Sequence, residues 1–330
     1  MNFVLLAGGS GTRLWPISKQ FDKIFRRDDG TWESMLQRVC RKIREHYPRA
    51  AVTVAASEDQ VSAVRDQLGS DVRICREPCR RDTFPAAALA AVYLREEQGA
   101  APDETVVVCP VDPWVDDDYF KALGRLGEQA AKGEANLVLM GIEPTAPSVK
   151  YGYILPESAE QTSRAAAFHE KPDAETARSY IAQGALWNGG VFAFRLEYML
   201  RKAHERIDFA DYRDLLAKYA ALDKISFDHA VAEHEPSIQV QRFSGSWTDI
   251  GTWDALLEVM EGPVTGKALL NETCENIRVL NLLDIPVVCV GLRNAVIAAS
   301  PKGILISDRD QAAQIRPVVE AFIAGTDGPR

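Results

Sequence analysis

Short, almost wholly apolar runs alternate with helical segments along the first half of the chain, and this alternation constrains the fold most. The runs are rich in Val, Leu and Ile and comprise residues 3–6, 52–56, 72–75, 105–111 and 137–141. Continuous apolar strands are typical of a parallel sheet that is buried on both faces. We therefore predict an α/β fold with a mostly parallel sheet and helices on both faces. In such sheets ligands bind at the carboxyl ends of the strands, so the loops there are the places to look for chemistry.

The segments between these runs carry apolar residues at helical spacing. The expected helices are 33–44, 58–68, 85–97 and 119–131. Thr31 is the N-cap that we expect for the first helix and Ser57 the N-cap for the second, because their hydroxyls can accept from the first free backbone N–H groups. Pro85 suits the first turn of the third helix, where no backbone donor is lost.

The second half of the chain has a different pattern. Residues 150–260 mix strand-like and helical segments, and after Gly262 short β runs appear at 285–290, 295–298 and 304–306. A closing helix is expected at 310–323. We therefore predict a large domain over residues 1–262 and a small β-rich domain over residues 263–330, ending in a helix.

Composition excludes several classes of protein. Lys and Arg total 38 against 47 Asp and Glu, a formal charge of −9, which argues against a nucleic-acid partner because such binding needs a basic field. No apolar stretch approaches the ~18 residues of a membrane span. The N-terminal residues lack a basic region and lead straight into glycines, which argues against a secretory signal peptide. The six cysteines do not have the spacing of a zinc site. We expect a cytoplasmic protein with reduced thiols and no membrane partner.

A glycine-rich loop, Gly8-Gly9-Ser10-Gly11-Thr12-Arg13, directly follows the first strand. Glycines allow close backbone approach, so that successive N–H groups can face an anion. The loop lacks the Gly-Lys-Ser/Thr ending of a P-loop and the third glycine of the dinucleotide fingerprint. A guanidinium beside such a turn suits a triphosphate whose leaving part is pyrophosphate. The alternative is a tight structural turn with an exposed arginine.

Several further segments follow this loop in a characteristic order. They are Leu14-Trp15-Pro16, Glu77-Pro78-Cys79-Arg80-Arg81-Asp82-Thr83, Pro110-Val111-Asp112-Pro113, Tyr151-Gly152-Tyr153-Ile154, Glu170-Lys171-Pro172, Trp187-Asn188-Gly189-Gly190 and Trp247-Thr248-Asp249-Ile250-Gly251. Together they resemble the motifs of sugar-1-phosphate nucleotidylyltransferases, and Arg-Leu-Trp-Pro is typical of the mannose-1-phosphate guanylyltransferases among them. The resemblance covers about residues 1–260 strongly and the remainder weakly. It implies a Rossmann-like nucleotide-diphospho-sugar transferase fold with a small β-helix-like C-terminal segment.

The resemblance also implies a reaction: GMP passes from GTP to mannose 1-phosphate, and pyrophosphate leaves. The attacking phosphate oxygen is already an anion, so the task is to neutralise charge with Mg²⁺ and cationic side chains. The implied magnesium ligands are Asp112 and Asp249. The implied nucleotide-binding residues are Leu6, Ala7, Gly8, Gly9, Ser10, Gly11, Thr12, Arg13, Asp82, Thr83, Pro110 and Asp112. The implied residues for the sugar and its phosphate are Tyr151, Gly152, Glu170, Lys171 and Asn188, and the implied catalytic residues are Arg13, Asp112, Lys171, Asp249 and a lysine after the glycine loop.

The position of that lysine departs from the family pattern. The family has a lysine about ten residues after the arginine, usually in Pro-Lys-Gln-Phe. Here Lys19-Gln20-Phe21 keeps the neighbouring residues but lies six residues after Arg13, whereas Lys23 keeps the spacing and loses the neighbours. We favour Lys19 slightly and keep Lys23 as the alternative.

Two other functions remain open at this point. The same chemistry could serve another sugar 1-phosphate, such as a manno-heptose 1-phosphate, because the lining of the pocket decides the substrate. The shortened loop also suggests a catalytically silent homologue with a regulatory role. The sequence allows a homodimer but does not decide the oligomeric state.

Overall fold

The computed structural model describes residues 1–9 and 12–323, and the chain forms two compact units. Unit 1 comprises residues 1–8, 40–111 and 115–247, and unit 2 comprises residues 9–39, 112–114 and 248–330. The long N-terminal loop thus belongs with the C-terminal region, which the sequence did not indicate. The domain boundary at residue 262 stays a prediction.

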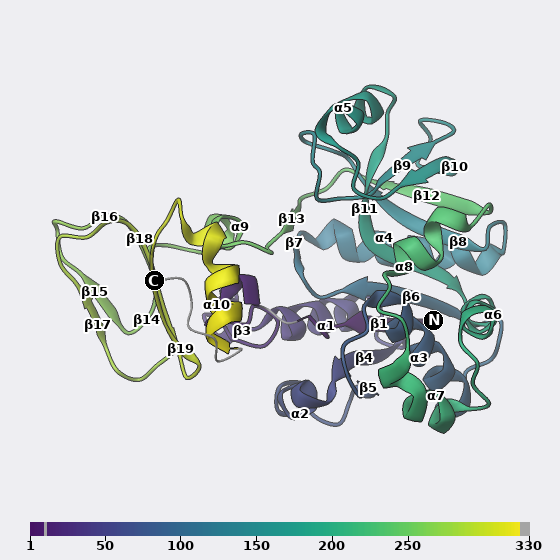
Figure 1. The fold of residues 1–330 in the computed structure, drawn as a ribbon, viewed down its shortest axis with the longest axis horizontal. Helices are drawn as coiled ribbons and strands as arrows, with labels where there is room; N and C mark the ends of the chain where they lie inside the picture. The colour runs from purple at the N-terminus through teal and green to yellow at the C-terminus, as the bar shows by residue number, and fades with distance from the viewer. Residues whose placement is uncertain (10–11, 324–330) are drawn as a thin grey trace. The chain divides into compact units, whose positions relative to one another are not determined.

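A nine-stranded sheet is the centre of unit 1 (Figure 1). Its strands, from one edge to the other, are β5 (Arg73–Glu77), β4 (Ala51–Ser57), β1 (Asn2–Leu6), β6 (Thr105–Pro110), β11 (Leu186–Arg195), β8 (Leu137–Ile142), β12 (Ile238–Phe243), β10 (Thr162–His169) and β9 (Tyr153–Pro156). The predicted α/β class is confirmed, and β5, β4, β1 and β6 are parallel as expected. Beyond them β11 runs antiparallel to both β6 and β8, and β12 is parallel to β8.

Helices cover both faces of this sheet, as the continuous apolar strands predicted. Val106 and Val108 of β6 belong to the core that also includes most of α3 (Thr83–Glu96). Val107 points the other way, and its Cγ2 lies 3.1 Å from where a Cβ would stand at Gly127 of α4 (Asp117–Lys132). The other helices of this unit are α2 (Val61–Leu68), α5 (Ala174–Ala182), α6 (Leu196–Arg206), α7 (Tyr212–Lys218) and α8 (Phe227–Ala230).

The first long helix, α1 (Met35–His46), begins later than expected. Its cap is Ser34, whose Oγ accepts from the backbone N–H of Gln37, while the Gln37 side chain accepts from the N–H of Ser34. Thr31 instead donates to Asp29 within a turn, so the predicted Thr31 cap is wrong. The reciprocal Ser–Gln pair satisfies two backbone donors, which explains why the helix starts there. The Ser57 cap before residues 58–60 is present with the same reciprocal pattern.

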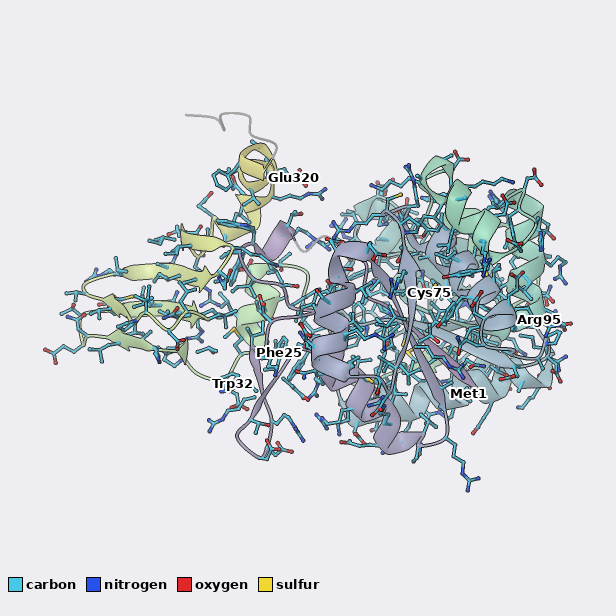
Figure 2. All side chains as sticks on the ribbon, turned by 90° about the horizontal axis from the view of Figure 1, so that it is seen from below. Met1, Phe25, Trp32, Cys75, Arg95 and Glu320 are labelled. Atoms are coloured by element: carbon cyan, nitrogen blue, oxygen red, sulfur yellow. The ribbon has the colours of Figure 1, made fainter. Side chains whose placement is uncertain are left out.

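Unit 2 combines the N-terminal loop with a β-rich region. The loop includes the short helical turn η1 (Thr12–Leu14) and a hairpin of β2 (Phe25–Arg26) and β3 (Trp32–Glu33), whose Phe25 and Trp32 are labelled in Figure 2. The β-rich region has two stacks of strands, β14 (Val264–Gly266), β16 (Glu275–Asn281), β18 (Arg293–Ser300) and β19 (Gly303–Asp308) in one, and β15 (Ala268–Leu270) and β17 (Val287–Cys289) in the other. All the pairings are parallel except that of β18 with β19. This is the arrangement of successive coils of a β-helix.

The described residues also include two further α-helices and two short strands. They are α9 (Trp253–Val259), α10 (Ile315–Ile323), β7 (Pro113–Val115) and β13 (Trp247–Asp249), the last two paired as a separate sheet. Among the described residues, no helix combines the length and the apolar composition that crossing a membrane requires.

Candidate active site

Three of the predicted phosphate and metal residues lie together in unit 2. Lys19 is buried, and its Nζ lies 3.6 Å from Oδ2 of Asp112 and 3.7 Å from Oδ1 of Asp249. Gln20 donates from Nε2 to Oδ1 of Asp112 over 3.0 Å. Asp112 and Asp249 come from distant parts of the sequence, and one ammonium group holds both carboxylates.

The local fold explains why these carboxylates are in place. Asp112 follows β6 after a single residue, at the carboxyl edge of the sheet, and Asp249 ends β13. Gly251 lies close beside them, because a Cβ there would lie 3.1 Å from Oδ1 of Asp249 and 3.2 Å from Nη1 of Arg13. The absence of a side chain at Gly251 therefore lets the exposed Arg13 guanidinium approach the same cluster.

The alternative lysine is placed differently. Lys23 is exposed, just before the buried Ile24. It takes part in no ion pair with any carboxylate of the described residues. Gly9 approaches Gln20 closely, since a Cβ at Gly9 would lie 2.9 Å from Nε2 of Gln20. Ser10 and Gly11, two of the predicted nucleotide-binding residues, lie outside the described residues.

Of the remaining predicted nucleotide residues, Thr12 lies in η1 of unit 2, and Leu6, Ala7, Gly8, Asp82, Thr83 and Pro110 lie in unit 1. Leu6 of β1 is in register with Pro110 of β6, and the N–H of Ala7 donates to the carbonyl of Ala55. Asp82 caps α3 in a left-handed conformation with φ 72°, accepting from the N–H of Thr83.

Glu77 begins the motif Glu77-Pro78-Cys79-Arg80-Arg81-Asp82-Thr83, but the sequence indicated no role for this residue. This buried carboxylate ends β5, and its Oε2 accepts from the hydroxyl of Tyr219 over 2.9 Å. Its Oε1 lies 3.0 Å from where a Cβ would stand at Gly8 of the glycine loop. Burial raises the pKa of Glu77, against the opposing effects of Tyr219 and Arg80.

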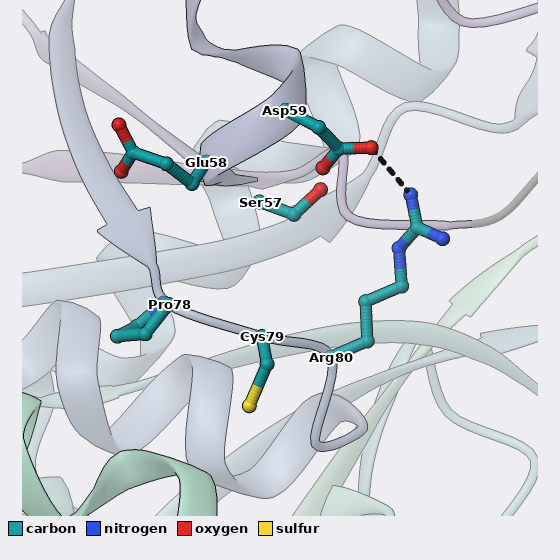
Figure 3. A pocket seen from close by; sticks show the side chains of 6 residues that line it. All are labelled: Ser57, Glu58, Asp59, Pro78, Cys79 and Arg80. Carbon is teal, nitrogen blue, oxygen red and sulfur yellow. Dashed lines mark hydrogen bonds and ion pairs between the residues drawn. The ribbon is translucent and has the colours of Figure 1, made fainter.

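A surface pocket opens at the carboxyl ends of β4 and β5, immediately after Glu77. It is lined by Ser57, Glu58, Asp59, Pro78, Cys79 and Arg80. The Arg80 guanidinium reaches across it to Oδ2 of Asp59 over 3.4 Å (Figure 3). The pocket adjoins the strand ends where the parallel sheet predicted ligand binding.

The predicted sugar residues also come together in unit 1. Glu170 has a side chain that is only 5% exposed, and it pairs with the exposed Lys171. A Cβ at Gly152 would lie 2.6 Å from Oε2 of Glu170 and 3.4 Å from Cβ of Asn188, so a side chain there would displace the Glu170 carboxylate. The N–H of Asn188 donates to the carbonyl of Gly152 over 2.8 Å. Tyr151 lies next to this cluster.

Tyr151 packs against two tryptophans. Its ring centroid lies 4.9 Å from that of Trp187 and 5.4 Å from that of Trp247. Trp187 is itself buried and donates from Nε1 to the hydroxyl of Tyr153. The three aromatic rings thus pack against one another beside the predicted sugar residues, and the assignment of Tyr151 to the sugar stays a prediction.

Comparison with known proteins agrees with this arrangement of motifs. The family model described as nucleotidyl transferase matches residues 2–264. A xanthan biosynthesis protein, XanB, of Xanthomonas campestris is 33% identical, over 96% of this chain and 72% of its own. A putative mannose-1-phosphate guanylyltransferase of Vibrio cholerae is 31% identical, over 96% and 73%. The chain belongs to the nucleotidyl transferase family.

A solved structure matches nearly the whole chain. It comes from Thermus thermophilus and is described as a mannose-1-phosphate geranyltransferase. The identity is 30%, the match covers 98% of each chain, and the TM-score is 0.76. The similarity therefore extends over the β-rich C-terminal region as well as the large sheet.

Proposed function

We propose that this chain transfers GMP from GTP to mannose 1-phosphate, giving GDP-mannose and pyrophosphate. A phosphate oxygen of mannose 1-phosphate attacks the α-phosphorus of GTP in line. The new bond joins this oxygen to the α-phosphorus, and the bond from the α-phosphorus to the β-phosphate bridging oxygen breaks. The attacking oxygen is already deprotonated, so no general base is needed and charge neutralisation dominates.

The observation that carries the proposal is the cluster of Lys19, Asp112 and Asp249. The Lys19 ammonium is buried and makes no hydrogen bond within the described residues, yet it lies beside both carboxylates. The space between the Asp112 and Asp249 carboxylates therefore favours a cation. Carboxylate oxygens are ligands that Mg²⁺ prefers, and it takes its other ligands from phosphates and water. The two carboxylates thus fit a divalent cation, which would supply Lewis-acid neutralisation of the phosphates.

In the proposal, different cationic side chains bind the phosphates of the two substrates. In the proposed reaction Arg13 and Lys19 neutralise the triphosphate. Lys171 pairs with the phosphate of the sugar, and Glu170 accepts from a ring hydroxyl. The proposal assigns Asp112 and Asp249 to the chain as its metal ligands. Within the described residues no three His, Cys, Asp or Glu side chains gather into a metal site.

Glu77 supports guanine as the base. Guanine presents two adjacent donors, N1–H and the N2 amino group, to a carboxylate. Adenine places an acceptor beside its amino donor, and a carboxylate repels that acceptor. The Oε1 atom of Glu77 faces Gly8, and no described residue donates a hydrogen bond to it, whereas Oε2 is occupied by Tyr219.

The test is pyrophosphate release, measured for four nucleoside triphosphates against mannose 1-phosphate, glucose 1-phosphate and a manno-heptose 1-phosphate in the presence of Mg²⁺. The proposal expects the fastest release with GTP and mannose 1-phosphate. Faster release with another pair would reassign the substrate. No release with any pair, from a protein of normal melting temperature, would support the catalytically silent homologue.

A further inference from the structure

Asp228, in the second position of α8, is a carboxylate that sequence reasoning did not select. Its Oδ1 accepts from Nδ2 of Asn188 over 2.7 Å. Asn188 is otherwise fixed, because its Oδ1 accepts from the N–H of Gly190 over 3.1 Å and its backbone N–H is bound to Gly152. Asp228 thereby sets the direction of the Asn188 amide and leaves one Nδ2 hydrogen for a ligand.

Two carboxylates converge on the same small region. Burial and the nearby Glu170 carboxylate raise the pKa of Asp228 to about 6, while Asn188, Lys171 and His229 act in the opposite direction. Asn188 is the one described donor within hydrogen-bond distance of Asp228. The cluster therefore has more acceptor oxygens than donors. A polyhydroxylated ring supplies the missing O–H donors, whereas an anion alone would be repelled.

A purely structural role would make Asp228 the anchor of α8, but other contacts already hold this segment. The N–H of Phe227 donates to Oγ1 of Thr83 over 2.7 Å, and the N–H of Phe84 donates to the carbonyl of Ile225. The fully buried Phe227 ring also stacks on Phe192 at 4.2 Å between centroids. The carboxylate of Asp228 is therefore not needed to place the helix.

We propose that Asp228 is a specificity-determining residue of the sugar subsite. It orients the Asn188 amide toward the sugar 1-phosphate and, together with Glu170, accepts hydrogens from the ring hydroxyls. This inference rests on the proposed function, since it requires a sugar 1-phosphate as substrate.

The experiment compares Asp228→Asn, Asp228→Ala and the control Asp223→Asn, which alters an exposed aspartate five positions earlier. The proposal expects the Michaelis constant for mannose 1-phosphate to rise at least ~10-fold in both Asp228 variants, with that for GTP changed less than ~2-fold. Deoxy analogues of mannose 1-phosphate identify the hydroxyl concerned. For the analogue that lacks it, wild type and Asp228→Ala should have similar kcat/KM.

A pH profile gives a second measurement. Asp228 is ionised above about pH 6, so its acceptor strength declines as the pH falls below that value. The Michaelis constant for mannose 1-phosphate should rise there in wild type more than in Asp228→Asn. Comparing the Michaelis constants of the two proteins cancels the effect of the substrate phosphate's own titration. Glu170, Lys171 and His229, which face Asp228, are present in both proteins.

The outcomes separate this proposal from the proposed function. If wild type uses another sugar 1-phosphate, the same variants are tested with that substrate, and the expectations for Asp228 are unchanged. An active wild type with an unaltered Michaelis constant in Asp228→Asn overturns the role of Asp228 alone. Equal losses for sugar phosphate and GTP also overturn it, because they indicate a structural role. A folded wild type that accepts no sugar 1-phosphate overturns both proposals.

Discussion

Replacing Lys19 by alanine should affect GTP and metal in opposite directions. The Lys19 ammonium lies 3.6 and 3.7 Å from the Asp112 and Asp249 carboxylates, whose side chains are 34% and 31% exposed. At such distances a unit charge pair is worth about 1 kcal/mol in bulk water and about 4.5 kcal/mol at an effective dielectric constant of 20. Partial exposure favours the lower part of this range. An ammonium at a similar distance from a phosphate oxygen of GTP falls in the same range, so we expect Lys19→Ala to lower kcat/KM for GTP at least ~10-fold, about 1.4 kcal/mol.

Metal binding should improve in the same variant. Without the ammonium, the two carboxylates repel each other and attract a divalent cation more strongly. Calorimetric titration of the nucleotide-free protein with Mn²⁺ should give a lower Kd for Lys19→Ala than for wild type. Lys23→Ala is the matched control, because Lys23 is exposed and lies outside the cluster. A larger loss of kcat/KM in Lys23→Ala, or weaker metal binding in Lys19→Ala, would refute the reasoning.

The remaining predictions concern the other assigned residues. Asp112→Asn and Asp249→Asn should each lower turnover at least ~100-fold, about 2.7 kcal/mol, because phosphate charge is left uncompensated; near-normal rates in both variants contradict the metal assignment. Lys171→Ala should raise the Michaelis constant for mannose 1-phosphate at least ~10-fold and leave that for GTP nearly unchanged, and steady-state kinetics with each substrate varied in turn decides this. Glu77→Gln should lower kcat/KM for GTP at least ~10-fold relative to kcat/KM for inosine triphosphate, which lacks the N2 amino group. The reason is that the neutral amide accepts a hydrogen bond less strongly and adds a donor. An unchanged ratio of kcat/KM between the two nucleotides would show that Glu77 does not recognise the base.

The parallel core of the sheet could be predicted because its strands are continuous apolar runs with helices between them. Asp112 could be placed for the same reason, since it directly follows such a run. The strand-like residues 190–194 indicate a strand where β11 lies, but the direction of β11 depends on which neighbours it pairs with, and local periodicity carries no information about that. The burial of Lys19 likewise depends on contacts across most of the chain.

Asp228 illustrates a different limit of sequence reasoning. It is the second residue of a four-residue helix, in the first turn, where an aspartate is ordinary. Its importance comes from Asn188 and Glu170, which are brought beside it by separate strands. The neighbouring Ser226 cap, which accepts from the N–H of His229, is the one local signal for this segment. Such a signal predicts a helix start but not a ligand.

The composition of unit 2 has a consequence for the order in which the protein matures during synthesis. Pro16, near the start of the chain, accepts a hydrogen bond from Ser300, 284 residues later, and Trp15 lies against Gly303. At ~5–20 residues per second, translation needs roughly 14–57 s to cover that separation. Within the loop that contains Lys19, the contacts of Trp15 and Pro16 must therefore wait for the last coils of the β-rich region. These contacts at the start of the chain are then among the last to form, and a ribosome-bound chain that lacks residues 300–303 cannot make them.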